Sequence, residues 1–375
     1  MVSLARRNLF HDKVRFLVTL TGIVFSVGLA TVQLGLFYGF LTTTSHVIAK
    51  SQADLWITSR GVGHLEAGMA FPERKVYQVL GTPGVARAER QIVQFGVWRL
   101  PSGADEAILL VGFNPDAGMG GPWNITEGNL EDLKADDTVF VDELYRDKLS
   151  VTHIGQTVEI RGYRARVVGF TRGIRSFTTS PPVFTSFKNA QNYFGIKEDQ
   201  TLYILVKAEP GVDIEDLRRR VSERVSDVDV MTTAQWTRKQ QYYWMVGTGA
   251  GVTVLTSAVL GLLVGGVVVA QTIYSATVDH IREYGTLKAI GASNSYIYRV
   301  IIKQAMISAT IGFIIGMGIS LVASYISHKT TTVVIVPWWM IISLFVLTLM
   351  MCVSASVVSI HKVMHLDPTI VFERG

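Results

Sequence analysis

The chain has 375 residues, of which 49% are hydrophobic and 17% charged, and its mean hydropathy is +0.32. This composition is too apolar for an ordinary soluble domain and indicates a membrane protein. The 35 basic and 30 acidic side chains leave a net charge of +5, and the basic excess lies beside the apolar runs. It therefore indicates contact with anionic membrane lipids and gives no support to nucleic-acid binding.

Long runs without Asp, Glu, Lys or Arg are the dominant pattern of the sequence. Each exceeds the ~20 apolar residues that a helix needs to cross the hydrocarbon core. The first run is too long for the apolar part of a signal peptide and lacks a small-residue cleavage site, so we expect it to remain as an anchor. The sequence predicts four transmembrane helices, over residues 16–40, 240–278, 304–327 and 330–360.

The flanking charges predict the orientation of these helices. Residues 1–15 form an amphipathic segment with four basic side chains against one acidic, so the positive-inside rule places the N-terminus in the cytoplasm. The loop 279–303 and the tail 361–375 then lie on the same side. Residues 41–239 lie outside, between the first and second helices.

Residues 41–239 have the patterns of an α+β domain. Alternating apolar side chains predict strands near 53–58, 90–100 and 106–113, and residues 156–170 predict a hairpin that turns at Arg161–Gly162. Residues 212–225 predict a helix with one apolar face. The single cysteine, Cys352, lies in the fourth predicted helix. The outer domain must therefore be held by its own apolar core.

Two features concern how the helices continue and pack. Residues 232–247 contain no helix breaker, so we expect a stalk helix that runs without interruption into the second membrane helix, with interfacial aromatic side chains. Pairs of glycines four residues apart allow close helix contact, either within the chain or with a second copy, and the sequence leaves both open. The pairs are Gly247 with Gly251, Gly261 with Gly265, and Gly312 with Gly316.

No pattern of catalytic or nucleotide-binding residues is present. The sequence has no phosphate-binding loop, zinc motif, nucleophile elbow or plausible catalytic cysteine. His46, His64 and His153 are irregularly spaced, as expected of loop or surface histidines. The charge-free membrane helices argue against an ion-coupled carrier. We therefore expect no catalytic residue, metal site or bound cofactor, and energy supplied by another protein.

The stretch "HIREYGTLKAIGAS" (280–293) separates two apolar runs. Apolar side chains recur at threefold spacing, which predicts a short amphipathic helix with Arg282, Glu283 and Lys288 on its polar face. Gly291 can end this helix, and Ser293 or Asn294 can cap the next one. Such a helix at the cytoplasmic end could be moved by a separate protein. The alternative is a helix that only lies at the interface.

This stretch resembles the coupling-helix signature of the FtsX/MacB-type permeases, the type VII family of ABC transporters, in which Glu-x-Gly-x-Leu-Lys-Ala-x-Gly-Ala follows the second membrane helix. The resemblance extends over the whole chain, and residues 110–128 are similar to the DevC-type branch. It implies a MacB/FtsX-like permease fold. It assigns contact with an ATPase to Arg282, Glu283, Tyr284, Gly285, Leu287, Lys288, Ala289 and Gly291.

The resemblance also implies an assembly. Two copies of the permease would bind two copies of a cytosolic ABC ATPase, which would hold ATP and Mg, in the bacterial cytoplasmic (inner) membrane with both termini in the cytoplasm. The DevC-type branch further implies a periplasmic membrane-fusion adaptor and an outer-membrane channel. Membrane lipids complete the expected partners.

Two functions remain open at this point. The first is export of an amphipathic substrate of the lipid, haem, drug or peptide class, and the second is FtsX-like control of an envelope enzyme or sensor without transport. For export, we expect aromatic, Met and weakly polar side chains at the outer membrane boundary to contact the substrate; the alternative is that they are ordinary belt and packing residues. These are Gln33, Phe37, Tyr38, Trp244 and Met245.

Overall fold

The structure is a computed structural model that describes residues 13–177, 180–279, 286, 291–327, 330 and 334–364. The chain divides into two compact units. The helical unit comprises Met1–Gly39, Val252–Ser327 and Val333–Gly375, and the sheet domain comprises Phe40–Gly251 and His328–Thr332.

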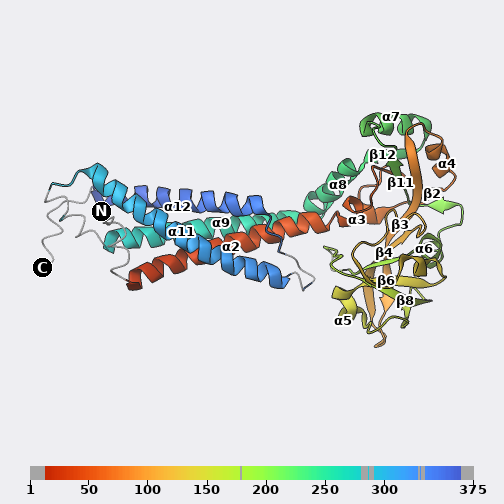
Figure 1. Cartoon of the computed structure of the whole chain (residues 1–375), viewed down its shortest axis with the longest axis horizontal. Helices are drawn as coiled ribbons and strands as arrows, with labels where there is room; N and C mark the ends of the chain where they lie inside the picture. The colour runs from red at the N-terminus through yellow and green to blue at the C-terminus, as the bar shows by residue number, and fades with distance from the viewer. Residues whose placement is uncertain are drawn as a thin grey trace. The chain divides into compact units, whose positions relative to one another are not determined.

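Long apolar helices build the helical unit: α2 (Lys13–Thr43), α9 (Ala250–Asp279), α11 (Asn294–Ser327) and α12 (Trp338–Met364) (Figure 1). Within the ranges that the structure describes, four helices are long and apolar enough to cross a membrane. This confirms the predicted number of spans. The candidate spans are Phe16–Thr43, Ala250–Ser275, Asn294–Ser327 and Trp338–Val358.

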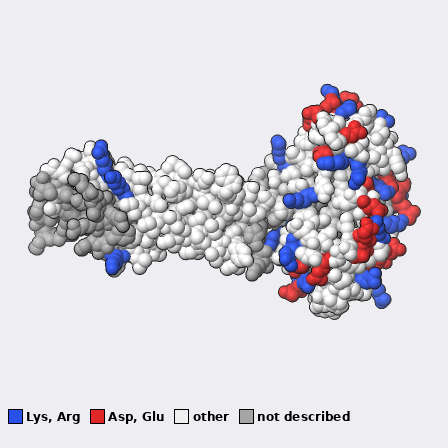
Figure 2. Space-filling view, in the orientation of Figure 1, with Lys and Arg blue, Asp and Glu red and all other residues white. Residues whose placement is uncertain are grey.

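Charged side chains in these helices are confined to one end of each. The sequence places them near the N-termini of α2 and α11 and near the C-termini of α9 and α12. Because successive helices run in opposite directions, these termini lie at one end of the helical unit (Figure 1). The apolar stretch between the helix ends is white in Figure 2. The charged residues are Lys13, Arg15, Asp279, Arg299, Lys303 and Lys362.

Two of the predicted glycine pairs pack within the chain. A Cβ added at Gly312 would lie 2.6 Å from Cγ2 of Ile23 on α2. At Gly265 the backbones approach closely enough for Ser26 Oγ to donate a hydrogen bond to the Gly265 carbonyl oxygen at 2.9 Å. Gly261 and Gly316 also face α2. Small residues on α9 and α11 thus let these helices approach α2 closely.

The sheet domain contains a ten-stranded sheet, with strand order β12-β1-β11-β3-β4-β9-β6-β8-β5 and with β7 pairing with both β3 and β8. A small second sheet pairs β2 with β10. The strands are β1 (Leu55–Ser59), β2 (Phe71–Pro72), β3 (Val85–Arg99), β4 (Asp105–Phe113), β5 (Ile125–Glu127), β6 (Thr138–Asp142), β7 (Thr157–Ile160), β8 (Tyr163–Thr171), β9 (Pro182–Ser186), β10 (Gln200–Thr201), β11 (Tyr203–Ala208) and β12 (Val228–Thr232).

Short helices cover and connect these strands (Figure 1). The α-helices are α3 (His46–Ala49), α4 (Lys75–Leu80), α5 (Arg146–Leu149), α6 (Phe187–Phe194), α7 (Ile214–Arg224) and α8 (Thr233–Tyr242). Tighter or wider turns of helix are η1 (Leu65–Ala67), η2 (Leu130–Lys134), η3 (Glu143–Tyr145) and η4 (Tyr243–Gly247), of which η4 is a π-helix.

Strand β3 belongs to two parts of the sheet. Its first half pairs with β11, and its second half pairs with β4 and β7. The pairings from β3 through β4, β9, β6, β8 and β7 return to β3, so these strands close a small barrel. One apolar core fills the barrel, and a second lies between α4, α7 and the strands β1, β11 and β12.

The predicted strands and hairpin are confirmed. Strands β1, β3 and β4 cover the three alternating stretches, and β7 and β8 form the expected hairpin. Arg161 and Gly162 at its turn both have positive φ, of 51° and 86°, as a two-residue type I′ turn requires. Strand β9 and helix α6 had no counterpart among the predicted elements.

The predicted continuous stalk helix is wrong. Helix α8 ends at Tyr242, the π-helical η4 follows, and α9 begins only at Ala250. Between them Gly249 has φ +74°, a conformation that no α-helix contains. Thr248 Oγ1 then accepts a hydrogen bond from the Ala250 N–H at 3.2 Å and starts a new helix. Gly247 and Gly251 therefore do not share one helical face.

Candidate functional site: a junction of two connecting segments

The residues predicted to contact substrate fall in both units. Gln33, Phe37 and Tyr38 are half-buried in the helical unit. The Tyr38 ring contacts the Trp339 ring edge-on, with centroids 5.6 Å apart. Gln33 packs at Gly261, where an added Cβ would lie 3.0 Å from Gln33 Cγ. These are helix-packing contacts, and a role in substrate binding stays a prediction.

Most residues predicted to contact the ATPase lie outside the described residues: Arg282, Glu283, Tyr284, Gly285, Leu287, Lys288 and Ala289. Gly291 is described and has φ +93°. Directly after it, Ser293 Oγ accepts a hydrogen bond from the Tyr296 N–H at 3.3 Å. The predicted capping of the next helix by Ser293 is thus confirmed.

Within the sheet domain, side-chain amides join two chain segments that are about 200 residues apart in sequence. We call this place the junction; its segments are residues 40–45, at the end of α2, and 240–244, at the end of α8. Gln241 Nε2 donates hydrogen bonds to the Leu41 carbonyl oxygen at 3.0 Å and to Ser45 Oγ at 3.2 Å. A displacement of one segment must therefore break these bonds or move the other.

The neighbouring Gln240 is fully buried and connects a third segment. Its Nε2 donates to the Thr44 carbonyl oxygen at 3.2 Å and to the Glu66 carboxylate at 3.1 Å, while its Oε1 accepts from the Leu65 N–H at 2.7 Å. Each polar group of this buried amide has a partner, which makes such networks costly to disrupt. The amide thus ties η1 to both segments of the junction.

An aromatic contact holds the first residue of the π-helical turn η4. The His64 ring stacks on the Tyr243 ring with centroids 3.8 Å apart and planes 16° from parallel. His64 Nδ1 lies 3.1 Å from Glu66 Oε2, so Glu66 contacts both the imidazole and the Gln240 amide. Tyr243 is thereby held at the point where α8 ends.

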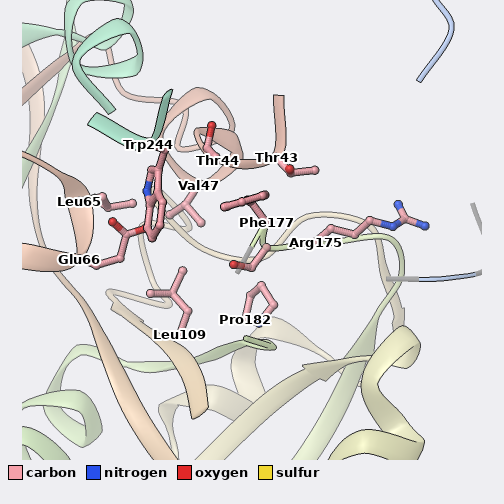
Figure 3. A pocket seen from close by; sticks show the side chains of 11 residues that line it. Thr43, Thr44, Val47, Leu65, Glu66, Leu109, Arg175, Phe177, Pro182 and Trp244 are labelled. Carbon is pink, nitrogen blue, oxygen red and sulfur yellow. The ribbon is translucent and has the colours of Figure 1, made fainter. Parts of the chain in front are cut away.

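A small cavity lies at the junction (Figure 3). The Trp244 and Phe177 side chains line it on the apolar side, and Glu66 and Thr44 are among its polar lining residues. Its volume is about 10 Å³, which is about the size needed for one water molecule. In this conformation, the space beside Trp244 therefore does not hold a drug-sized molecule.

His46 also lies in this region, on α3. Its ring is edge-on to the Trp123 ring at 6.1 Å, and its Nδ1 is buried without a hydrogen-bond partner in the described part of the chain. Burial, reinforced by the positive charges of Lys50 and Arg175, lowers the pKa of His46 below its usual value. The imidazole is therefore neutral at pH 7.

Comparison with known protein families identifies the family of this chain. Residues 16–224 match the MacB-like periplasmic core domain, which is more than half of the chain, and residues 244–368 match the FtsX-like permease C-terminal region. The chain belongs to the FtsX/MacB-type permeases of ABC transporters. It is thus an α-helical membrane protein with a large α+β domain between its first and second spans.

The individual relatives are distant in sequence, and their alignments cover different shares of the chain. The ABC transporter permease Rv0072 of Mycobacterium tuberculosis is 23% identical over 387 residues, which cover 99% of each chain. The ABC transporter permease YknZ of Bacillus subtilis is 22% identical over 226 residues, or 57% of this chain and 55% of YknZ.

Two solved structures align with about half of this chain. The periplasmic region of MacB from Actinobacillus actinomycetemcomitans aligns with a TM-score of 0.39 at 13% identity, covering 50% of this chain and 91% of that structure. The extracellular domain of YknZ aligns with a TM-score of 0.37 at 16% identity, covering 48% of this chain and 98% of that structure.

Sequence reasoning missed the polar residues of the permease's junction. Gln240 opens a charge-free run, which predicts the second span with the end of the stalk there, yet it is buried in the sheet domain, where its partners are backbone groups of Thr44 and Leu65 and the Glu66 carboxylate. The sequence feature that could have indicated the junction is the pair of adjacent glutamines, Gln240 and Gln241, between Trp236 and Tyr243. They carry no charge, so a span prediction based on charge alone could not separate them from the membrane helix.

Proposed function

We propose that this permease couples ATP hydrolysis by a separate cytosolic ATPase to movement of the sheet domain, and that this movement exports an amphipathic or hydrophobic substrate of the lipid, haem, drug or peptide class. The observation that supports it is the junction in a chain of this family. Hydrogen bonds from Gln240 and Gln241 join the end of α2 to the end of α8, so a displacement of one segment acts on the other.

The proposed assembly contains two permeases and two ATPase subunits in the bacterial inner membrane. ATP and Mg bind to the ATPase, and residues 282–291 receive its movement at the cytoplasmic side. The charged ends of the four helices would face the cytoplasm, as the positive-inside rule expects. Exposed apolar side chains on α9 and α11 are available to lipid or to the second permease; they include Val259, Leu263, Val267, Ile315, Ile319 and Val322.

In the export function, a periplasmic adaptor and an outer-membrane channel would carry the substrate onward. Trp244 and Met245, with Gln33, Phe37 and Tyr38, would contact the substrate when the protein changes conformation. Aromatic side chains with one apolar and one polar end suit an amphipathic molecule at a membrane boundary.

A second function, control of an envelope enzyme or sensor without transport, is favoured by one observation. The cavity at the junction has a volume of only about 10 Å³, which leaves room for about one water molecule. A junction of this kind transmits movement without requiring a substrate beside Trp244. The coupling to an ATPase would be the same in both functions.

The two functions can be separated in the assembled complex. The permease would be purified with its cytosolic ATPase and placed in proteoliposomes that contain a fluorescent lipid analogue and, separately, a hydrophobic fluorescent dye. Export predicts ATP-dependent loss of at least one probe from the membrane, reduced by Gly285→Leu in the coupling segment. ATP hydrolysis without movement of either probe, combined with a division or cell-wall defect on gene deletion, would favour the regulatory function.

A further inference from the structure

The loop that follows β8, residues 172–177, is held to the barrel by a buried carboxylate. Asp142 at the end of β6 is fully buried. One of its oxygens accepts hydrogen bonds from the Ile174 N–H at 2.7 Å and from Thr171 Oγ1 at 2.9 Å, and the other accepts from the Leu144 N–H at 3.1 Å. A buried carboxylate with several donors fixes the backbone around it.

A second anchor lies further along the same loop. Tyr145 is fully buried in the barrel core, and its hydroxyl oxygen accepts a hydrogen bond from the Ser176 N–H at 3.3 Å. Together, Asp142 and Tyr145 hold the loop at both of its ends. The side chains that the loop presents, Arg175 and Phe177, are thus placed by the barrel.

Phe177 contacts both segments of the junction. Its ring is edge-on to the Phe40 ring, with centroids 4.1 Å apart and planes at 87°. The same ring lies 5.7 Å from the Trp244 ring at 66°. Figure 3 shows Phe177 beside the cavity and Arg175 extending away from it. Edge-to-face pairs of this kind are favourable beyond the area that they bury.

Arg175 contacts the remaining connection. Its Nε donates a hydrogen bond to the Thr330 carbonyl oxygen at 3.2 Å. Thr330 belongs to the sheet domain and lies in the chain between α11 and α12. A single anchored loop therefore contacts Phe40 at the end of α2, Trp244 in η4, which precedes α9, and Thr330 in the α11–α12 connection, three places that are far apart in the sequence.

We infer that residues 172–177 form a coupling loop through which movement of all three connections reaches the barrel, with Arg175 and Phe177 as its positioning residues. This inference rests on the proposed function, because it assigns a route to the movement that the ATPase would drive. The loop needs its rigid anchors for this role, since a flexible loop would absorb the displacement. The family match does not assign these residues.

The test compares four variants in the full complex with the ATPase, reconstituted in nanodiscs. Phe177→Ala and Arg175→Ala remove the two contacts, and Arg175→Lys retains a donor. Arg164→Ala is the matched control, because Arg164 lies on β8, the strand that precedes the loop, and its side chain is exposed. Hydrogen exchange is measured without nucleotide and with vanadate-trapped ATP.

In the wild type, trapping should change the rate of hydrogen exchange at residues 41–49, which include the end of α2. It should also change the rate at residues 143–149, where Tyr145 contacts the loop. We expect Phe177→Ala and Arg175→Ala to reduce the change at 143–149 by about threefold or more, as loss of one or two such contacts allows. The change at 41–49 should persist. Arg164→Ala and Arg175→Lys should behave like the wild type.

Three other results would contradict these claims. A wild-type response at 143–149 in both alanine variants would overturn the coupling loop while leaving the proposed function intact. An unchanged exchange at 41–49 in the wild-type complex, despite trapped ATP, would contradict the proposed function itself. A variant that exchanges faster throughout the sheet domain without nucleotide would show a structural role only and would overturn the inference for that residue.

Discussion

The interactions that stabilise the sheet domain differ from those that stabilise the helical unit. The barrel core contains large side chains with no exposure, among them Trp98, Phe140 and Phe184, so burial of apolar area stabilises it. In the helical unit, glycines and hydroxyls allow backbones to approach, as at Gly312 and Ser26. The sheet domain is therefore suited to move as a body, whereas the helices of the helical unit approach one another at small residues.

This difference suits a protein that receives movement at its helices. Close packing of large side chains resists deformation, because shifting one of them opens a cavity. Helices that meet at small residues can change their contacts at a lower cost in free energy than a core of large side chains can. The junction lies where the connecting segments enter the rigid domain, and its bonds from Gln240 and Gln241 are positioned to pass a displacement on.

The largest expected effect tests the rigidity of the barrel. Trp98→Ala removes a fully buried ring and the hydrogen bond from its Nε1 to the Leu149 carbonyl oxygen. We expect a loss of about 3–5 kcal/mol in the free energy of unfolding of the sheet domain. Pulse proteolysis of the detergent-solubilised protein in urea measures it. Phe95→Ala is the control on the same strand, with a ring that is 36% exposed; equal losses in both variants would refute the comparison.

The second prediction concerns close approach in the helical unit. In Gly312→Leu, the new Cβ would lie 2.6 Å from Cγ2 of Ile23, so α2 and α11 must separate. We expect a cost of about 1–3 kcal/mol, seen as a lower melting temperature and poorer monodispersity in detergent. A Cβ added at Gly318 on the same helix would meet no atom within 4 Å, so Gly318→Leu should be tolerated. If the two variants are equally stable, this contact does not hold the bundle.

A third, local effect is expected at the junction. Gln240→Leu leaves the Leu65 N–H and the Glu66 carboxylate without their amide partner in a buried place. Each unsatisfied buried group costs about 1–3 kcal/mol, in part recovered by relaxation. Faster hydrogen exchange at residues 41–47, with little change in the barrel strands, is the expected result. The neighbouring exposed Arg238→Leu is the control, and similar exchange in the two variants would show that the amide does not join the segments.

The smallest expected effect depends on pH. The folded state lowers the pKa of His46 below its usual value of 6.5. Below that pH the unfolded chain therefore binds a proton that the folded chain does not, and stability falls as the pH drops below about 6.5. Melting temperatures at pH 7.5 and 5.5 should differ less in His46→Gln than in the wild type. An identical pH dependence in both proteins would show that His46 does not contribute.

The sequence was sufficient for the four spans and for local elements of the sheet domain. Charge-free runs predict helices of membrane length. The hairpin is predicted by the strand patterns on either side of Arg161–Gly162, and both turn residues have the positive φ that such a turn requires. The break at Gly249 was missed because glycine is also common inside membrane helices. The junction was missed because Gln241 and Leu41 are distant in sequence, and no local pattern predicts which backbone oxygen a glutamine will contact.

The central claim, that nucleotide binding moves the junction, can be measured directly. Cysteines are introduced at Ser45 and Gln241, whose side chains are 3.2 Å apart, in a Cys352→Ala background. Their cross-linking by a short bis-maleimide is timed in the permease–ATPase complex with and without trapped ATP. We predict that trapping changes the rate about fivefold or more, as a coupling free energy near the low end of the usual range produces, and that Gly285→Leu removes the change. Equal rates in both states of a complex that hydrolyses ATP would contradict the account.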